Sequence, residues 1–173
     1  MIVRILGLIL AAVVLAACDP TEGPVTSSPG APSARDMADV NGIRFRQLDA
    51  VNALRAGRGL GQLRYSQALN SAAKTHARDM ALQQRAWHFG TDRSNPQSRA
   101  ARAGYSGLVL GENIAEAFEG DIVTLQNWLD RTESANVILN REATDFGFAW
   151  FRESSGKIWW VQMLGRGSSG FGS

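Results

Sequence analysis

The chain has a single cysteine and only two histidines among its 173 residues. One cysteine cannot form an intramolecular disulfide, and it excludes Cys-rich zinc sites and CxxC redox chemistry. The charges are nearly balanced, with 18 Lys+Arg against 16 Asp+Glu and no run of basic residues, so a nucleic-acid partner is not expected. The HExxH, GxSxG, phosphate-loop and EF-hand patterns are also absent. What is left is the composition of an ordinary globular protein, 45% apolar and 20% charged, of a length that suits one domain.

The cysteine ends an N-terminal segment that has the features of a secretion signal. Arg4 precedes an apolar run over residues 5–14, which is short for a membrane span, and Leu-Ala-Ala then leads into Cys18. Residues 1–17 resemble a bacterial lipoprotein signal peptide, after which the cysteine becomes the acylated first residue. An uncleaved anchor helix or an ordinary signal peptide is the alternative. We expect acyl chains such as palmitate on Cys18 to anchor the protein in a membrane, facing the periplasm or the cell exterior.

The rest of the chain divides by composition into a linker, a domain and a tail. Residues 18–39 hold four of the five prolines and almost no large apolar side chain, as is typical of a flexible linker. Residues 166–173 are rich in glycine and serine, which indicates a flexible tail. The folded unit is therefore predicted over residues 40–165, as a monomer.

Periodicity within the folded unit predicts helices first and strands last. Apolar residues recur at helical spacing in four segments, and the period changes to two over residues 146–150. A second apolar run over 158–164 follows a turn-like Ser-Ser-Gly, so the two runs should pair as an antiparallel hairpin. This order indicates an α+β fold. The residues expected to start the four helices are Asn41, Ser66, Asn95 with the proline after it, and Asp121.

Three residues are candidates for chemistry. His76 lies on the apolar face of the predicted second helix, where a neutral core histidine is the favoured interpretation. His88 follows that helix at the start of an irregular stretch, so its ring can reach a surface cleft. Glu112 stands between a glycine and an apolar segment, where a carboxylate is paired, caps a helix or lines a cleft.

Several short motifs resemble, in order and spacing, those of the CAP superfamily, also called SCP domains. The resemblance covers about residues 45–164 and implies an α-β-α sandwich around an antiparallel sheet, in agreement with the order of predicted elements. The motifs are residues 52–55 (NALR), 69–80 (LNSAAKTHARDM), 87–90 (WHFG), 102–105 (RAGY), 111–115 (GENIA) and 159–162 (WWVQ).

Members of that family often carry two histidines and two glutamates that can hold a divalent metal such as zinc in a central cleft. His88 and Glu112 match the first histidine and the first glutamate. Ser134 stands where the second histidine is usual, and Arg131 takes the fourth position. The resemblance thus implies a ligand cleft at His88, Glu112, Glu133 and Ser134, with His88 and Glu112 as a reduced metal site. Two ligands are fewer than zinc normally takes, and the alternative is a hydrogen-bonded His88/Glu112 pair without metal.

Three functions remain open at this point. The favoured one is a non-catalytic binding module, held on the membrane, for a lipid or another cell-envelope ligand. The second is a metal-dependent hydrolase that uses the reduced His/Glu site or His88 as a general base. The third is a structural surface lipoprotein whose tryptophans are ordinary core residues. No catalytic residue is assigned.

Overall fold

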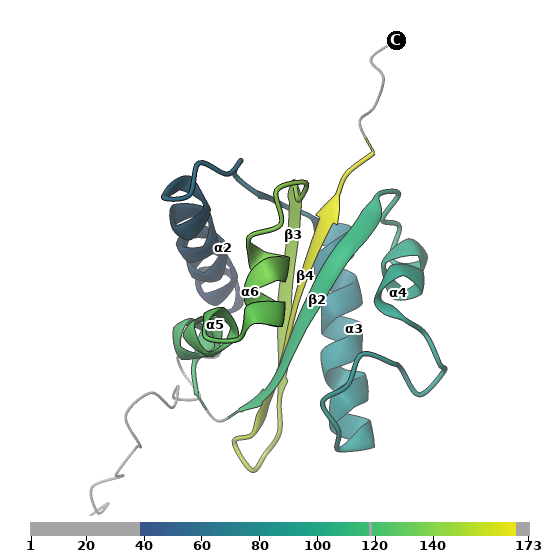
Figure 1. Cartoon of the computed structure of the whole chain (residues 1–173). Helices are drawn as coiled ribbons and strands as arrows, with labels where there is room; N and C mark the ends of the chain where they lie inside the picture. Colours follow the sequence, from purple (N-terminus) through teal and green to yellow (C-terminus); the bar gives the residue numbers. More distant parts are fainter. Residues whose placement is uncertain (1–38, 118, 169–173) are drawn as a thin grey trace, which may run out of the picture.

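The computed structural model describes residues 39–117 and 119–168 (Figure 1). The predicted signal peptide, Cys18, nearly all of the linker and the last five residues lie outside the described part. The elements, in chain order, are α2 (Val40–Ala56), β1 (Arg64–Tyr65), α3 (Gln67–Gln83), α4 (Pro96–Arg102), β2 (Leu108–Ala117), α5 (Asp121–Leu129), α6 (Thr132–Ile138), β3 (Asp145–Arg152) and β4 (Ile158–Arg166).

Side-chain caps fix the start of three helices. Ser66 caps α3 by accepting a hydrogen bond from the Leu69 amide, as predicted. Asn95 accepts from the amide of Ser98, whose hydroxyl accepts from the Asn95 amide in return, and Pro96 takes the first position of α4. The cap of α2 was predicted wrongly. Its first turn is capped by the Asp39 carboxylate and not by Asn41, so the helix starts a little earlier.

The strands form one sheet in the order β1-β3-β4-β2. β3 and β4 make the predicted antiparallel hairpin, in which Trp150 lies opposite Trp160. β2 pairs antiparallel with β4 along nearly its whole length, whereas the two residues of β1 pair parallel with β3. The sheet is thus antiparallel apart from β1, and β2 forms one of its two edges.

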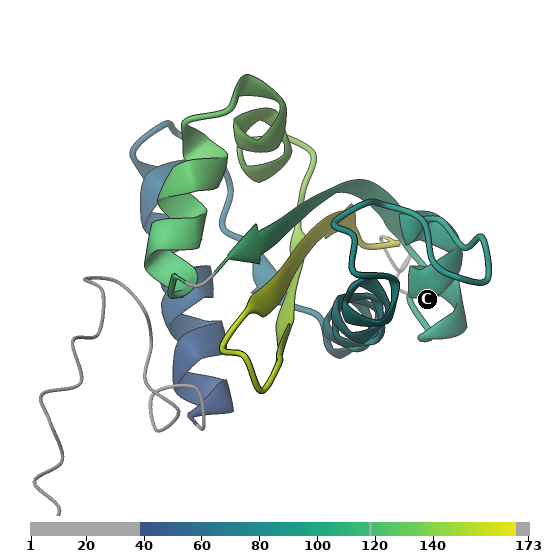
Figure 2. The same ribbon diagram turned by 90° about the horizontal axis from the view of Figure 1, so that it is seen from below.

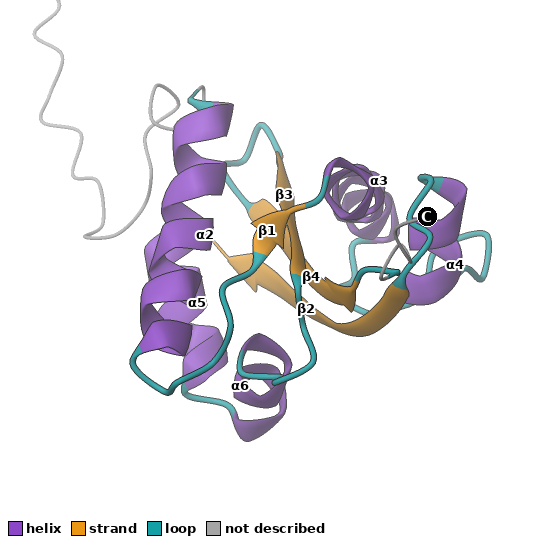
Figure 3. Cartoon of the chain, turned by 90° about the horizontal axis from the view of Figure 1, so that it is seen from above, coloured by secondary structure: helices purple, strands orange, loops and turns teal. Residues whose placement is uncertain are grey.

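Helices cover both faces of the sheet. Figures 1 and 3 show α2, α5 and α6 on one side and α3 and α4 on the other, and Figure 2 shows the same separation from below. The predicted α-β-α sandwich is therefore confirmed. The side chains of β3 and β4 alternate between two cores, which contain Trp128, Phe146, Phe148, Trp160 and Leu164 on the first face and Leu69, Met80, Trp159, Val161 and Met163 on the second.

Two packing details were not visible from periodicity. α3 lies so close to β3 that a Cβ on Gly147 would be 2.4 Å from the main-chain carbon of Leu69. Arg55 of α2 is fully buried, and its guanidinium donates to four main-chain carbonyls, one in the segment after α2, one at the last residue of α6 and two in the segment after α6. Within residues 39–117 and 119–168, no helix is both long and apolar enough to cross a membrane.

Candidate functional site

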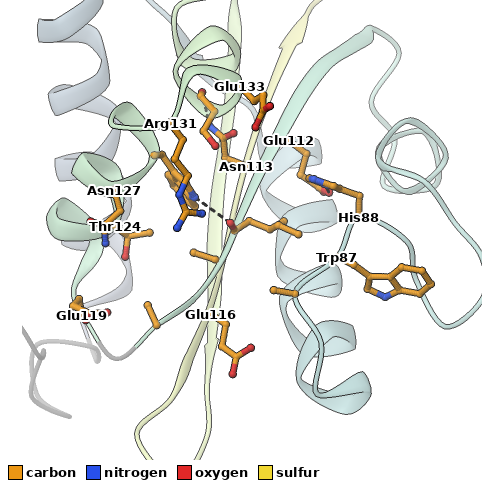
Figure 4. A pocket seen from close by; sticks show the side chains of 16 residues that line it. Trp87, His88, Glu112, Asn113, Glu116, Glu119, Thr124, Asn127, Arg131 and Glu133 are labelled. Carbon is orange, nitrogen blue, oxygen red and sulfur yellow. Dashed lines mark hydrogen bonds and ion pairs between the residues drawn. The ribbon is translucent and has the colours of Figure 1, made fainter.

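A pocket of about 580 Å³ lies along the edge strand β2. One wall comes from Trp87 and His88, which follow α3, and the other comes from α5 and α6 (Figure 4). The structure brings all four residues of the expected cleft, His88, Glu112, Glu133 and Ser134, to this one pocket. The lining is mostly polar, with amide, hydroxyl and carboxylate side chains around the middle and end of β2.

Glu112 lies at the buried end of the pocket. β2 directs its side chain toward the layer of α3 and α4, where the side chain is only 1% exposed. Oε1 accepts a 2.9 Å hydrogen bond from Nδ1 of His88, and Oε2 accepts a 2.6 Å bond from Nη2 of Arg99. Each carboxylate oxygen therefore already has a charged or polar donor, as a buried carboxylate requires.

Arg99 is the counter-ion of Glu112. It lies on α4 with its side chain 3% exposed, and its Nη1 donates at 3.0 Å to the main-chain oxygens of both His88 and Ser94. The same guanidinium thus holds the Glu112 carboxylate and the loop that carries His88. A positive charge at this place makes the position unfavourable for a second cation.

His88 connects the buried pair to the open pocket. Its side chain is about half exposed. Because the carboxylate of Glu112 only accepts hydrogen bonds, Nδ1 of His88 carries the hydrogen in this contact. Nε2 is then the ring nitrogen available to a ligand. Among the described residues, no hydrogen bond joins His88 to a serine or threonine hydroxyl.

His76 lies beneath this cluster and is fully buried on α3, as expected for a core histidine. Its Nε2 lies 2.9 Å from the Trp87 carbonyl oxygen, which can only accept, and 3.8 Å from Oε1 of Glu112. Burial is the main cause that lowers the pKa of His76 below its usual range, although the nearby Glu112 charge acts in the opposite direction. Nδ1 has no hydrogen-bond partner among residues 39–117 and 119–168. His76 therefore supports the Trp87 main chain as a neutral ring.

The α6 part of the other wall is held in place by a hydrogen bond between β2 and α6. Asn113 points to the opposite face of the sheet from Glu112, and its side-chain amide donates to the main-chain oxygen of Ser134 and to Gln162. This fixes the start of α6 beside β2. The side chains of Arg131 and Glu133 are exposed at the pocket mouth and make no hydrogen bond or ion pair with other described residues.

The residues present do not fit the divalent metal that the family resemblance implies. His88 and Glu112 meet as a hydrogen-bonded pair, with Nδ1 of His88 directed at the carboxylate and Arg99 bound to the second oxygen. His76 uses Nε2 for the Trp87 carbonyl. No group of three or more His, Cys, Asp or Glu side chains in the described part of the chain is arranged to hold a metal ion. Zinc normally takes three or four protein ligands.

The main omission from the sequence analysis is Arg99. The α4 helix carries two arginines three residues apart; Arg99 is buried on Glu112, whereas Arg102 is exposed and paired with Asp92. No local pattern separates the two. The polar pocket residues Asn113, Thr124 and Asn127 were also not identified, because their partners and walls come from distant segments.

The fold is similar to solved bacterial structures. An extracellular protein containing an SCP domain from Bacillus anthracis superposes with a TM-score of 0.68 at 23% identity, over 81% of this chain and 45% of that chain. An outer surface protein from Borrelia burgdorferi gives 0.64 at 17% identity, over 72% of this chain and 92% of that one. A cysteine-rich secretory protein from Staphylococcus aureus gives 0.55 at 16% identity, over 73% of this chain and 39% of that one.

This chain thus spans less than half the length of the Bacillus anthracis protein, and at these identities the likeness concerns the fold. No curated protein matches the chain. A family model described as CAP, the cysteine-rich secretory protein family, matches residues 48–164, which is more than half of the sequence. The chain therefore belongs to the CAP family, also known as the cysteine-rich secretory protein family.

Proposed function

We propose that this protein is a membrane-anchored, extracytoplasmic lipoprotein whose CAP domain binds a cell-envelope ligand in the β2 pocket without catalysing a reaction. The observation that carries the proposal is the state of Glu112. Arg99 and His88 occupy its two oxygens, so the buried carboxylate organises the pocket wall and is not free for metal or proton transfer. The exposed side of His88 and the polar groups around it are left for a ligand.

The lining favours a polar ligand over an acyl chain. A lipid chain is held by apolar walls, whereas this pocket presents the amide of Asn127 and the charged ends of Arg131 and Glu133. Trp87 borders the pocket, but Figure 4 shows its indole pointing away from β2, and the Arg85 guanidinium lies over the ring. This lining suits a hydrogen-bonding envelope component.

The sequence supports the lipid anchor, and the similar proteins support a location outside the cytoplasm. The N-terminal segment has the features of a lipoprotein signal ending at Cys18. Two of the similar structures are described as an extracellular protein and an outer surface protein. We expect a Cys18→Ala variant to lose both the incorporation of labelled palmitate and its presence in the membrane fraction; membrane retention without label would contradict lipid anchoring.

Ligand binding is tested by blocking the pocket. Asn127 lines the pocket, is exposed, and its side chain makes no hydrogen bond or ion pair with another described residue, so Asn127→Trp fills the site at little structural cost. Ile122→Trp is the matched control, because Ile122 is on the same helix, 43% exposed, and outside the pocket lining. The probes are a soluble peptidoglycan fragment and vesicles of phosphatidylglycerol, followed by NMR shifts of the backbone amides.

Saturable shifts at residues of the pocket with the peptidoglycan fragment, lost in Asn127→Trp and kept in Ile122→Trp, would support this pocket as the ligand site. Shifts with the vesicles alone would make the ligand a lipid. Binding that survives in Asn127→Trp, or cleavage of the fragment by the wild type that is lost in His88→Ala, would contradict the proposal.

A further inference from the structure

The floor of the pocket is the free edge of the sheet. β2 is an edge strand, and residues 112–117 line the pocket one after another, including side chains that point to opposite faces. Since side chains alternate between the two faces of a strand, a pocket with walls from both helical layers and a run of β2 residues between them lies along the edge of that strand. In Figure 4 the strand passes between the two walls, with His88 and Trp87 on one side and Asn127 and Thr124 on the other.

One hydrogen bond shows which main-chain groups face the pocket. The indole nitrogen of Trp128 donates to the main-chain oxygen of Ile114 at 3.1 Å, from the side opposite β4. In an antiparallel strand, the N–H and C=O of one residue point to the same side, and the side alternates along the chain. Ile114 and Glu116 therefore direct their main-chain groups into the pocket, whereas Asn113, Ala115 and Ala117 pair with β4.

These outward groups lack a partner from elsewhere in the described chain. Apart from the Trp128 bond, no hydrogen bond from outside the sheet reaches the main chain of residues 112–117 in the described segments. Glu116 is exposed and Ile114 is partly exposed as residues, and no acceptor for their amides is found in the described segments, which leaves these amides for a ligand. The bond from Trp128 uses one of the two lone pairs of the Ile114 oxygen and leaves the other.

We infer that the ligand of this pocket is an extended peptide segment of another envelope protein, which adds to β2 as a further strand. The inference rests on the proposed function and specifies the class of ligand. Main-chain pairing of this kind is a common mode of peptide recognition. Residues 112–117 offer a floor about 17 Å long at the usual rise of a strand, which suits a segment of about five or six residues.

The walls decide between a single peptide and a second copy of this chain. The β2 edge is recessed between Trp87 and His88 on one side and α5 with α6 on the other. A second sandwich would bring its own helical layers against these walls before its edge strand came within the roughly 4.8 Å that pairing needs. A lone extended peptide has no such layers and fits.

The residues of the two walls determine which peptide side chains would bind well. Alternate side chains of the added strand would face the Trp87 and His88 wall, where the half-exposed ring of His88 offers a polar contact. The others would face Thr124, Asn127 and the mouth at Glu133, which suits polar residues and a basic side chain. Glu112 and Glu116 are already paired with Arg99 and Lys157, so Glu133 is the carboxylate available to such a base.

The experiment uses the full chain in detergent micelles. A phage-displayed library of random heptapeptides is panned against it, and the best peptide is synthesised in three forms. One form is unmodified. The other two carry N-methyl groups on alternate amides, so that one form is blocked along one edge of the extended peptide and the other form along the opposite edge. The side chains are the same in all three. Amide hydrogen exchange of Ile114 and Glu116 is followed by NMR, with Asn113 and Ala115 as internal controls.

Strand addition predicts that the unmodified peptide slows exchange at Ile114 and Glu116 and leaves Asn113 and Ala115, already paired with β4, unchanged. One N-methylated form should bind at least about tenfold more weakly and the other nearly as well as the parent. In the protein, Glu116→Pro removes an outward N–H without breaking a bond to β4 and should abolish binding, whereas Glu116→Ala should keep it. Thermal melting of both variants shows whether they remain folded.

Equal binding of all three peptide forms, no change in exchange at Ile114 and Glu116, or panning that enriches no peptide would each overturn the inference. Slowed exchange that depends on protein concentration without any peptide would show self-association at β2 and would also overturn it. If peptides fail while a peptidoglycan fragment still binds and is blocked by Asn127→Trp, the proposed function stands without this inference. If nothing binds, both fail.

Discussion

Removing the guanidinium of Arg99 should destabilise the domain strongly. Arg99 and Glu112 are 3% and 1% exposed in their side chains, and Arg99 makes three hydrogen bonds, to Glu112, His88 and Ser94. In Arg99→Met the Glu112 carboxylate keeps its charge in a buried place but loses the partner of Oε2. Breaking one side of such a buried pair typically costs roughly 3 to 5 kcal/mol in the free energy of unfolding.

Urea unfolding of the wild type and three variants measures this cost. Arg102→Met is the matched control, because Arg102 is on the same helix and forms an exposed ion pair with Asp92. It should change stability far less, since water screens that pair. The double variant Arg99→Met with Glu112→Gln should be more stable than Arg99→Met alone, because the buried charge is gone. If Arg99→Met costs no more than Arg102→Met, Arg99 does not hold Glu112 as described.

Three further predictions concern stability. Trp128 is 1% exposed and its indole N–H is bonded to Ile114, so Trp128→Ala should cost roughly 3 to 5 kcal/mol in urea melts; a cost near zero would contradict its burial. Gly147→Ala should cost on the order of 2 kcal/mol because its Cβ would meet the backbone of α3, whereas Gly61→Ala, with open space around it, should cost much less. Burial lowers the pKa of His76 in the folded protein. As the pH falls, this histidine is therefore protonated in the unfolded chain before it is protonated in the folded one. The unfolding free energy should therefore be highest above about pH 6.5 and decrease below it by at most about 1.4 kcal/mol per pH unit. The decrease should be smaller in His76→Gln, and equal slopes in melts between about pH 7.5 and 5.5 would refute this account of His76.

Local signals predicted much of the fold. The caps at Ser66 and Asn95 start two helices, and the alternation over residues 146–150 identified β3 and its hairpin with β4. These features depend on residues close in sequence, so the sequence carries them directly. The α-β-α sandwich was predicted from the resemblance to the CAP family, because local signals do not show how the helices pack on the sheet.

β2 and α6 were missed for physical reasons. Strand alternation is obscured in β2 because Glu112 and Asn113 are adjacent, polar and both buried. They point to opposite faces, and each is satisfied by a partner far away, Arg99 for the first and Ser134 for the second. The apolar pattern that is typical of a strand packed between helices is therefore interrupted at these two residues.

The candidate site was only partly predictable. The resemblance identified His88 and Glu112, and the structure joins them by a hydrogen bond. Ser134 and Glu133 reach the same pocket from α6. The contact that changes the chemical interpretation, Arg99 on the second oxygen of Glu112, depends on how α4 packs beside β2. No spacing rule in the sequence contains that information.

In the proposed function, this pocket binds its ligand without a metal. The most direct test is calorimetric titration of Zn²⁺ into purified residues 35–173, beside His88→Ala and Glu112→Ala forms of the same segment. We expect no saturable binding that depends on either residue. Micromolar binding by the wild type that is lost in both variants would contradict metal-free binding, because it would show that Arg99 yields the carboxylate to a metal.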